Sequence, residues 1–208
     1  MATVLTDDMP GSKKKDDSQE ILKAALSVFV QKGFANTTMA DIAKATGRPV
    51  AEIRAKYPSK EELLIAAFRS GQKKMETNLR QVIGGDLEDH VALMFDSILM
   101  GLMPFGPEIH LNLTLQATKD KILMEIVKRT SRNVNFAIKA YLAQMVSLSI
   151  MEPLDEVEKV NDEMVASVIP YMAGILEGKK LPAIKKEWVA SVRKMLKTSS
   201  KTTVPPSM

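Results

Sequence analysis

Cysteine is absent from this chain of 208 residues, and histidine occurs only twice. Without cysteine the chain can form neither a disulfide framework nor a thiolate metal site, and its composition fits a reducing compartment. His90 and His110 are too far apart in sequence to form a local metal-binding motif. We also find no nucleophile paired with a base and no phosphate-binding loop. The sequence therefore predicts no metal, no cofactor and no enzymatic activity.

Aromatic residues make up only 5% of the chain, although hydrophobic residues make up 45% and methionine occurs 14 times. The core is therefore expected to be aliphatic and rich in methionine. No apolar run reaches the roughly 20 residues that span a bilayer, and the N-terminus lacks the apolar core of a signal peptide. We expect a soluble, cytoplasmic protein, long enough for one sizeable domain or for a small domain joined to a larger one.

The net charge of +4 is distributed unevenly along the chain. Residues 1–60 contain ten Lys/Arg and seven Asp/Glu, whereas residues 61–180 contain thirteen and seventeen. Residues 181–208 contain six Lys/Arg and one Asp/Glu. The mildly basic N-terminal part is compatible with contact to nucleic acid phosphates. The C-terminal part is more basic, but most basic tails of this kind are simply solvated.

Helical periodicity runs through the chain, and no segment shows the alternation of a strand, so we predict an all-α fold. The helices are expected near 18–32, 49–57, 60–81, 87–101, 120–149, 155–176 and 182–197. Pro170 is expected to kink the second-last of them. Two further short helices are expected, one between Thr38 and the break at Thr46 and Gly47, and one through His110, Leu113 and Ala117. The predicted organisation is a disordered basic arm (1–17), a three-helix helix-turn-helix domain (18–59), a connecting helix (60–85), a larger helical bundle (86–198) and a disordered tail (199–208).

The segment from Thr37 to Lys60 has the pattern of a helix-turn-helix. Thr38 can cap a short helix through its hydroxyl group, and Asp41 lies in the first turn, where the helix dipole favours negative charge. Gly47 allows the left-handed backbone of a sharp turn, and Pro49 suits the opening of a second short helix.

This part of the chain, roughly from Ser18 to Phe68, resembles the N-terminal domain of TetR/AcrR-type transcriptional repressors. The resemblance is carried by Ile21, Ala24, Ala25, Phe29, Gly33, Phe34, Thr37, Thr38, Ile42, Ala43, Gly47, Tyr57, Pro58, Ser59, Lys60, Leu63 and Leu64. It implies a dimer that binds a palindromic DNA operator, represses transcription and is released by a small hydrophobic effector. The second short helix departs from the family pattern, because Glu52 stands where threonine is usual and Pro49 where a small or hydroxyl residue is common.

The resemblance places the DNA contacts on and around that second short helix. The candidate DNA-binding residues are Lys15, Thr38, Arg48, Val50, Glu52, Arg54, Lys56, Tyr57 and Lys60. Arginine can bind guanine edges and lysine can bind phosphates, so we assign the base contact to Arg54 and a phosphate contact to Lys56. Glu52 would lie near phosphates, or could accept a hydrogen bond from cytosine. The arm that contains Lys15 could follow the DNA or could only increase solubility.

The resemblance also implies an effector cavity in the helical bundle. Methionine adapts to ligands of variable shape, and a pocket needs a few polar groups. The candidate ligand-binding residues are Met94, Met100, Met103, His110, Gln116, Met124, Tyr141 and Met145. The alternatives are that the methionines are ordinary core residues, and that His110 and Gln116 have capping or solvent-facing roles.

Two apolar stripes near the C-terminus exceed what a terminal helical hairpin must bury by itself. They predict a four-helix dimer interface formed by Val160, Met164, Val168 and Met172 on one helix and by Ile184, Trp188 and Val192 on the next. The alternative is that the two stripes close the core of the monomer.

Two other functions stay open at this stage. The chain could be a divergent family member that no longer binds DNA and acts through protein partners, which Pro49 and Glu52 make conceivable. The second alternative is that the chain is an enzyme, and only detectable turnover of a substrate would support this alternative.

Overall fold

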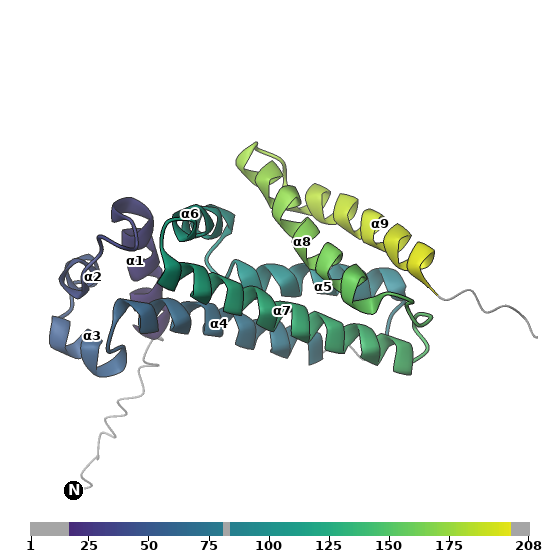
Figure 1. The fold of residues 1–208 in the computed structure, drawn as a ribbon, viewed down its shortest axis with the longest axis horizontal. Coiled ribbons are helices and arrows are strands. Elements are labelled where there is room, and N and C mark those ends of the chain that lie inside the picture. Colours follow the sequence, from purple (N-terminus) through teal and green to yellow (C-terminus); the bar gives the residue numbers. More distant parts are fainter. Residues whose placement is uncertain (1–16, 81–83, 201–208) are drawn as a thin grey trace, which may run out of the picture.

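The computed structural model describes residues 17–80 and 84–200, and this part of the chain forms nine α-helices (Figure 1). The helices are α1 (Asp17–Lys32), α2 (Met39–Thr46), α3 (Val50–Lys56), α4 (Lys60–Arg80), α5 (Leu87–Leu102), α6 (Pro107–Ala117), α7 (Lys121–Ser147), α8 (Val157–Leu176) and α9 (Leu181–Ser199). The only β-type pairing among the described residues is an isolated bridge between Leu154 and Ser200. The all-α prediction is confirmed.

The three N-terminal helices form a head at one end of an elongated molecule (Figure 1). Helix α4 leaves the head and runs into the body beside α7, and it packs chiefly against α5. Helices α8 and α9 pack against each other and against α5. The rest of the body therefore connects to the head mainly through α4, α6 and the beginning of α7.

Two hydrophobic cores divide the molecule. The smaller core combines the head with residues of α6 and α7, among them Leu113 and Ile126. The larger core combines α5, α8 and α9 with the middle of α7. Helix α4 belongs to both, because Leu64 near its beginning is buried in the smaller core and Met75 is buried in the larger one. One continuous helix thus links the packing of the head to that of the body.

Gly71 permits the close contact between α4 and α5. A Cβ atom at this position would lie 2.2 Å from the Met100 carbonyl oxygen and 2.6 Å from the Pro104 Cβ. Contacts this short do not occur in folded proteins, and one of the contacting atoms is backbone. The absence of a side chain at Gly71 therefore sets how closely the two helices approach.

The C-terminal helices differ slightly from the predicted ranges. Asp155 lies outside α8, and its backbone N–H donates to the Ser199 carbonyl oxygen (3.1 Å). Helix α9 continues to Ser199, two residues beyond the predicted end, and this contact ties its end to the segment before α8. The predicted basic arm up to residue 16, including Lys15, and the predicted tail from residue 201 lie outside the described residues. Over the described ranges no single helix is long and apolar enough to cross a membrane; α5 and α6 pass such a test only as a pair bent by 55°.

Candidate nucleic-acid interface

The predicted helix-turn-helix is present in α2, the turn at Gly47 and α3. The Thr38 hydroxyl accepts a hydrogen bond from the Asp41 backbone N–H (3.2 Å), and the Asp41 carboxylate accepts one from the Thr38 backbone N–H (2.9 Å). These two bonds form a capping box, which satisfies N–H groups at the start of α2. Gly47 adopts φ 67°, in the left-handed region that glycine tolerates best. Thr38 and Gly47 therefore have the structural roles that the sequence assigned to them.

A lysine of α1 holds the beginning of α2 in place. Lys32 Nζ donates to Asp41 Oδ1 (2.5 Å). This hydrogen bond is the largest cause that holds the pKa of Asp41 well below its usual range, and the bonds from Thr38 add to it. Asp41 is therefore a negatively charged anchor between α1 and α2 rather than a group that titrates near neutral pH.

Helix α3 buries one side and exposes the other. Ile53 is fully buried, Tyr57 is nearly so, and Val50 is half-buried, so these three side chains attach α3 to the smaller core. Val50 and Tyr57 were among the predicted DNA contacts, and the structure gives both a packing role. The exposed residues of α3 are Ala51, Glu52, Arg54, Ala55 and Lys56. This side is the surface that α3 can present to DNA.

Arg48 and Glu52 interact with each other at the beginning of α3. The Arg48 guanidinium contacts Glu52 Oε1 at 2.5 Å and Asp17 Oδ2 at 3.1 Å. The hydrogen bond to Glu52, followed by that to Asp17, raises the pKa of Arg48. The charge of Arg48 is offset by two carboxylates, and in turn Arg48 offsets the charge of Glu52. The ion pair reduces the repulsion that an isolated Glu52 would exert on phosphates.

Lys60 and Lys56 also have partners within the chain. Lys60 Nζ donates to the carbonyl oxygens of Phe34 (2.6 Å) and Ala35 (3.0 Å) and lies over the Phe34 ring. Lys60 therefore holds the chain between α1 and α2 against the start of α4. Lys56 donates to the Ser18 hydroxyl and lies 5.8 Å from the centre of the Tyr57 ring, but it remains exposed.

Arg54 and Lys44 are the exposed cations of the helix-turn-helix that have no ion pair or hydrogen bond among the described residues. Arg54 lies on α3 and was predicted to contact a base. Lys44 lies in the last turn of α2 and was not among the predicted contacts. Its position three residues before the Gly47 turn is the sequence signal that could have identified it.

Residues 21–67 match the family model of bacterial regulatory proteins of the tetR family. The match covers α1 to α3 and the first turns of α4. Residues 21–67 therefore belong to the tetR family of bacterial regulatory proteins. A comparison with curated proteins found no match.

Several solved structures share the fold over nearly the whole chain. GusR from Salmonella enterica has a TM-score of 0.67 and 16% identity, and the alignment covers 89% of this chain and 98% of GusR. The fatty acid degradation regulator FadR from Bacillus halodurans has a TM-score of 0.66 and 17% identity, with coverages of 87% and 96%. A TetR transcription regulator from Haloarcula marismortui has a TM-score of 0.64 and 16% identity, with coverages of 89% and 99%. At these identities the similarity shows the fold alone.

The eight predicted effector residues do not line one cavity. Met94, Met103, Tyr141 and Met145 are buried in the larger core, Met100 packs against that core, and Met124 packs against the smaller core. Met103 and His110 line a hollow of about 10 Å³ between head and body, which is too small for an effector. Packing is therefore the role that the described structure gives to the methionines.

His110 and Gln116 connect α6 to other parts of the molecule. His110 is 5% exposed, and burial lowers its pKa, although a hydrogen bond with the Leu102 backbone acts in the opposite direction. Gln116 Nε2 donates to the Phe29 carbonyl oxygen (2.9 Å), and its Oε1 accepts from the Phe34 backbone N–H (2.5 Å). A side chain of the body thus binds backbone groups at the end of α1.

The predicted dimer-interface residues are in the core of the single chain, so this prediction requires correction. The seven side chains are at most 4% exposed and belong to the larger core; they are Val160, Met164, Val168, Met172, Ile184, Trp188 and Val192. Trp188 shows the reason, since its ring packs against Phe95 of α5 and its Nε1 donates to the Ser167 hydroxyl (2.8 Å). The stripes face α5 and each other, and only other faces of α8 and α9 can meet a partner.

Proposed function

We propose that this regulator is a cytoplasmic transcriptional repressor, which binds a palindromic DNA operator as a dimer and is released by a small hydrophobic effector. The exposed side of α3 is the observation that carries the proposal. It lies at the end of the molecule, is anchored by the buried Ile53, and offers the guanidinium of Arg54, which has no ion pair or hydrogen bond within residues 17–80 and 84–200. A short helix presented in this way can enter the major groove.

The contacts on this side support different roles for its cations. Arg54 has no partner to lose among the described residues, so it can donate two hydrogen bonds to a guanine edge. Lys44 and Lys56 flank α3 and suit phosphates. The Arg48–Glu52 pair makes Glu52 compatible with docking, which favours the repressor over the alternative of a member that no longer binds DNA.

The outward face of α8 supports dimer formation. Ala166, Ile169, Ala173 and Leu176 follow the three- and four-residue spacing of one helix face, and Leu176 is 55% exposed. A second copy packed on this face would cover apolar surface. A two-fold dimer would also place two α3 helices for the two halves of a palindrome.

Helix α4 and Gln116 support effector control of DNA binding. Both connect the body to the head, so a change in body packing can alter the position of α3. The effector must bind the conformation that does not bind DNA more tightly than the other, because equal affinity for both conformations shifts nothing.

The test begins with DNA fragments selected by the purified protein, followed by binding titrations over a range of salt concentrations. Arg54→Ala should weaken operator binding by about 1–3 kcal/mol and relax the preference at one position. Lys56→Ala should weaken binding to all sequences alike and reduce the salt slope by about one. Lys74→Ala, which removes an exposed charge from the middle of α4, is the matched control and should change neither. Failure to bind any genomic fragment at low salt would support the alternative that acts through protein partners.

A further inference from the structure

Three adjoining hollows lie along the surface between α4 and α7. The hollow nearest the head has a volume of about 520 Å³, the middle one about 180 Å³ and the far one about 490 Å³. Ile65, Ile126 and Arg129 line both the first and the middle hollow, and Gln72 and Asn133 line both the middle and the far one. These shared walls join the hollows into one surface, the α4–α7 groove.

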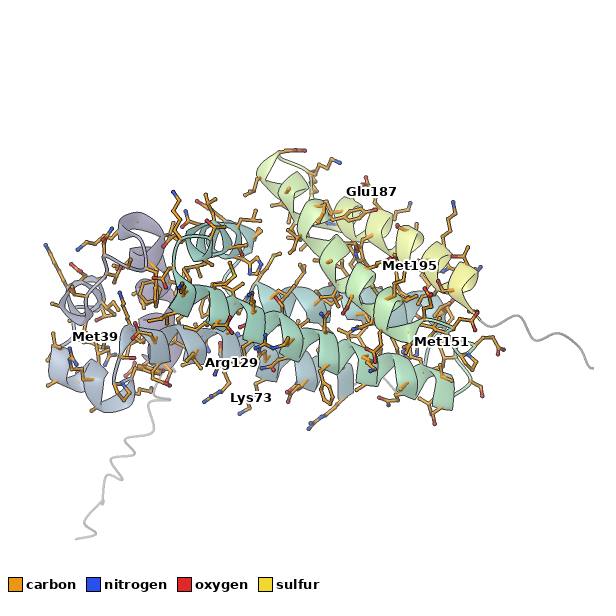
Figure 2. The ribbon with its side chains drawn as sticks, viewed as in Figure 1. Met39, Lys73, Arg129, Met151, Glu187 and Met195 are labelled. Carbon is orange, nitrogen blue, oxygen red and sulfur yellow. The ribbon has the colours of Figure 1, made fainter. Side chains whose placement is uncertain are left out.

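Two arginines face each other across the middle of the α4–α7 groove. Arg69 comes from α4 and Arg129 from α7, and no carboxylate lines this hollow. Neither guanidinium has an ion pair or hydrogen bond within the described ranges, 17–80 and 84–200. The amides of Gln72 and Asn133 lie beside them and bond to each other (3.3 Å). Figure 2 labels Arg129 on the side of the body away from α8 and α9. This arrangement offers a localised site for an anionic group.

The buried residues that line the far hollow are mainly apolar. Met75 and Leu79 of α4 and Tyr141 of α7 line it and are buried in the larger core. Phe136 also lines it and is 76% exposed, which is unusual for such a large apolar side chain. An apolar ligand in this hollow would cover the Phe136 ring and remove it from water.

We propose that the α4–α7 groove binds an amphipathic anion, with its carboxylate or phosphate between Arg69 and Arg129 and its alkyl chain over Met75, Leu79 and Phe136. Arg69 and Met75 are six residues apart, so the two parts of the site are separated by roughly 9 Å along α4. This spacing suits a single molecule with a charged end and an alkyl chain. The proposal names the class of effector and its site, and in that respect it rests on the proposed function.

The surrounding charges favour one localised anionic group over a polyanion. Glu61 and Glu125 line the first hollow together with Lys121 and Arg132, and Glu76 lines the far one together with Arg80, so the cations at both ends of the groove have carboxylates beside them. Only the middle hollow has arginines and no carboxylate. A nucleic acid strand laid along the groove would meet these carboxylates. A neutral hydrophobic molecule would gain nothing from the two arginines.

The experiment measures direct binding of decanoate and decyl phosphate to the full chain by calorimetry, at concentrations below micelle formation. Decanol is the uncharged control with the same chain, and inorganic phosphate is the anion without a chain. We expect both amphiphiles to bind at least tenfold more tightly than decanol or phosphate, and the tighter of the two identifies the preferred head group. Arg69→Gln and Arg129→Gln should each weaken binding about tenfold, because each removes a charge-assisted hydrogen bond. Lys74→Gln, which lines none of the three hollows, should leave the affinity unchanged.

Equal binding of decanol, or equal binding by the two arginine variants and the parent, would overturn the proposal. All three substitutions are at exposed positions, so thermal unfolding should show unchanged folding. The effect of decanoate on operator binding is measured separately. If the ligand binds but leaves the affinity for DNA unchanged, the binding site is supported and its role as an effector site is refuted. If the protein binds its operator but binds none of these ligands, the repressor function is supported and the binding site is refuted.

Discussion

The head and the body of this chain each have a hydrophobic core, but the head depends more on polar bonds to the backbone than the body does. In the head, polar bonds fix the geometry: the Thr38–Asp41 capping box orients α2, and Lys60 and Gln116 bind backbone groups next to α1. In the body, α8 and α9 are held by buried apolar side chains such as Trp188. Directional bonds act on few neighbours, whereas packing is shared by many. The loss of one polar bond in the head should therefore act locally, and a change in the body core should act on the whole fold.

The largest effect is expected from Trp188→Glu. Trp188 is fully buried, so a carboxylate there would lie in the larger core without its own partner, and the protein should lose about 3–5 kcal/mol or more of its free energy of unfolding. Leu176→Glu, on the outward face of α8, should leave the monomer folded and dissociate the proposed dimer. Sedimentation and thermal unfolding of both variants separate the two outcomes. A folded monomer from Trp188→Glu would show that this residue is at an interface after all.

Gly71→Ala tests the joint between the two regions. Helix propensity alone predicts that alanine is more stable than glycine by about 1 kcal/mol. The 2.2 Å distance from a Cβ atom to the Met100 carbonyl predicts the opposite, a loss of about 1–3 kcal/mol, because α4 must move away from α5. Urea unfolding decides between them. Thr77→Ala, at an exposed position of the same helix, controls for a general effect of substitution in α4; a stabilised Gly71→Ala protein would mean that the two helices are not in close contact.

Gln116→Ala should have a smaller and more local effect. It removes the acceptor of the Phe34 backbone N–H and the donor to the Phe29 carbonyl oxygen, and we expect a loss of about 1 kcal/mol. Hydrogen exchange should become faster at the Phe34 amide and stay unchanged in α5 and α8. Gln31→Ala, an exposed glutamine of α1, is the control. Equal exchange at Phe34 in the variant and the parent would show that this contact does not hold the head to the body.

The smallest effect concerns pH and His110. Burial lowers its pKa in the folded chain below the ordinary value of 6.5. Well above pH 6.5 the residue is neutral in both states and contributes no pH dependence to the stability. As the pH falls below 6.5 the unfolded chain binds a proton first, so stability decreases until the pH reaches the lower pKa of the folded state. His110→Leu should reduce the difference between urea midpoints measured at pH 7.5 and pH 5.5; an unchanged difference would assign it to other groups.

Local chemistry in the sequence determined the helices, the turn at Gly47 and the family of the head. Caps, glycine turns and proline positions act over a few residues, so the chain carries these signals wherever it folds. The same local character explains why α2, α3 and the beginning of α4 could be placed from sequence.

Only the tertiary structure decided what each surface contacts. The stripe that contains Trp188 shows that one face of α9 is buried, but periodicity does not say whether α5 or a second chain covers it. The charges around α3 show the same limit, since Arg48 and Lys60 look free in sequence and are bound to Glu52 and to the Phe34 carbonyl oxygen in the fold. Arg69 and Arg129 line the same part of the α4–α7 groove, although they are 60 positions apart in the sequence. The physical reason is that packing between distant segments depends on the positions of all helices at once, which no local pattern encodes.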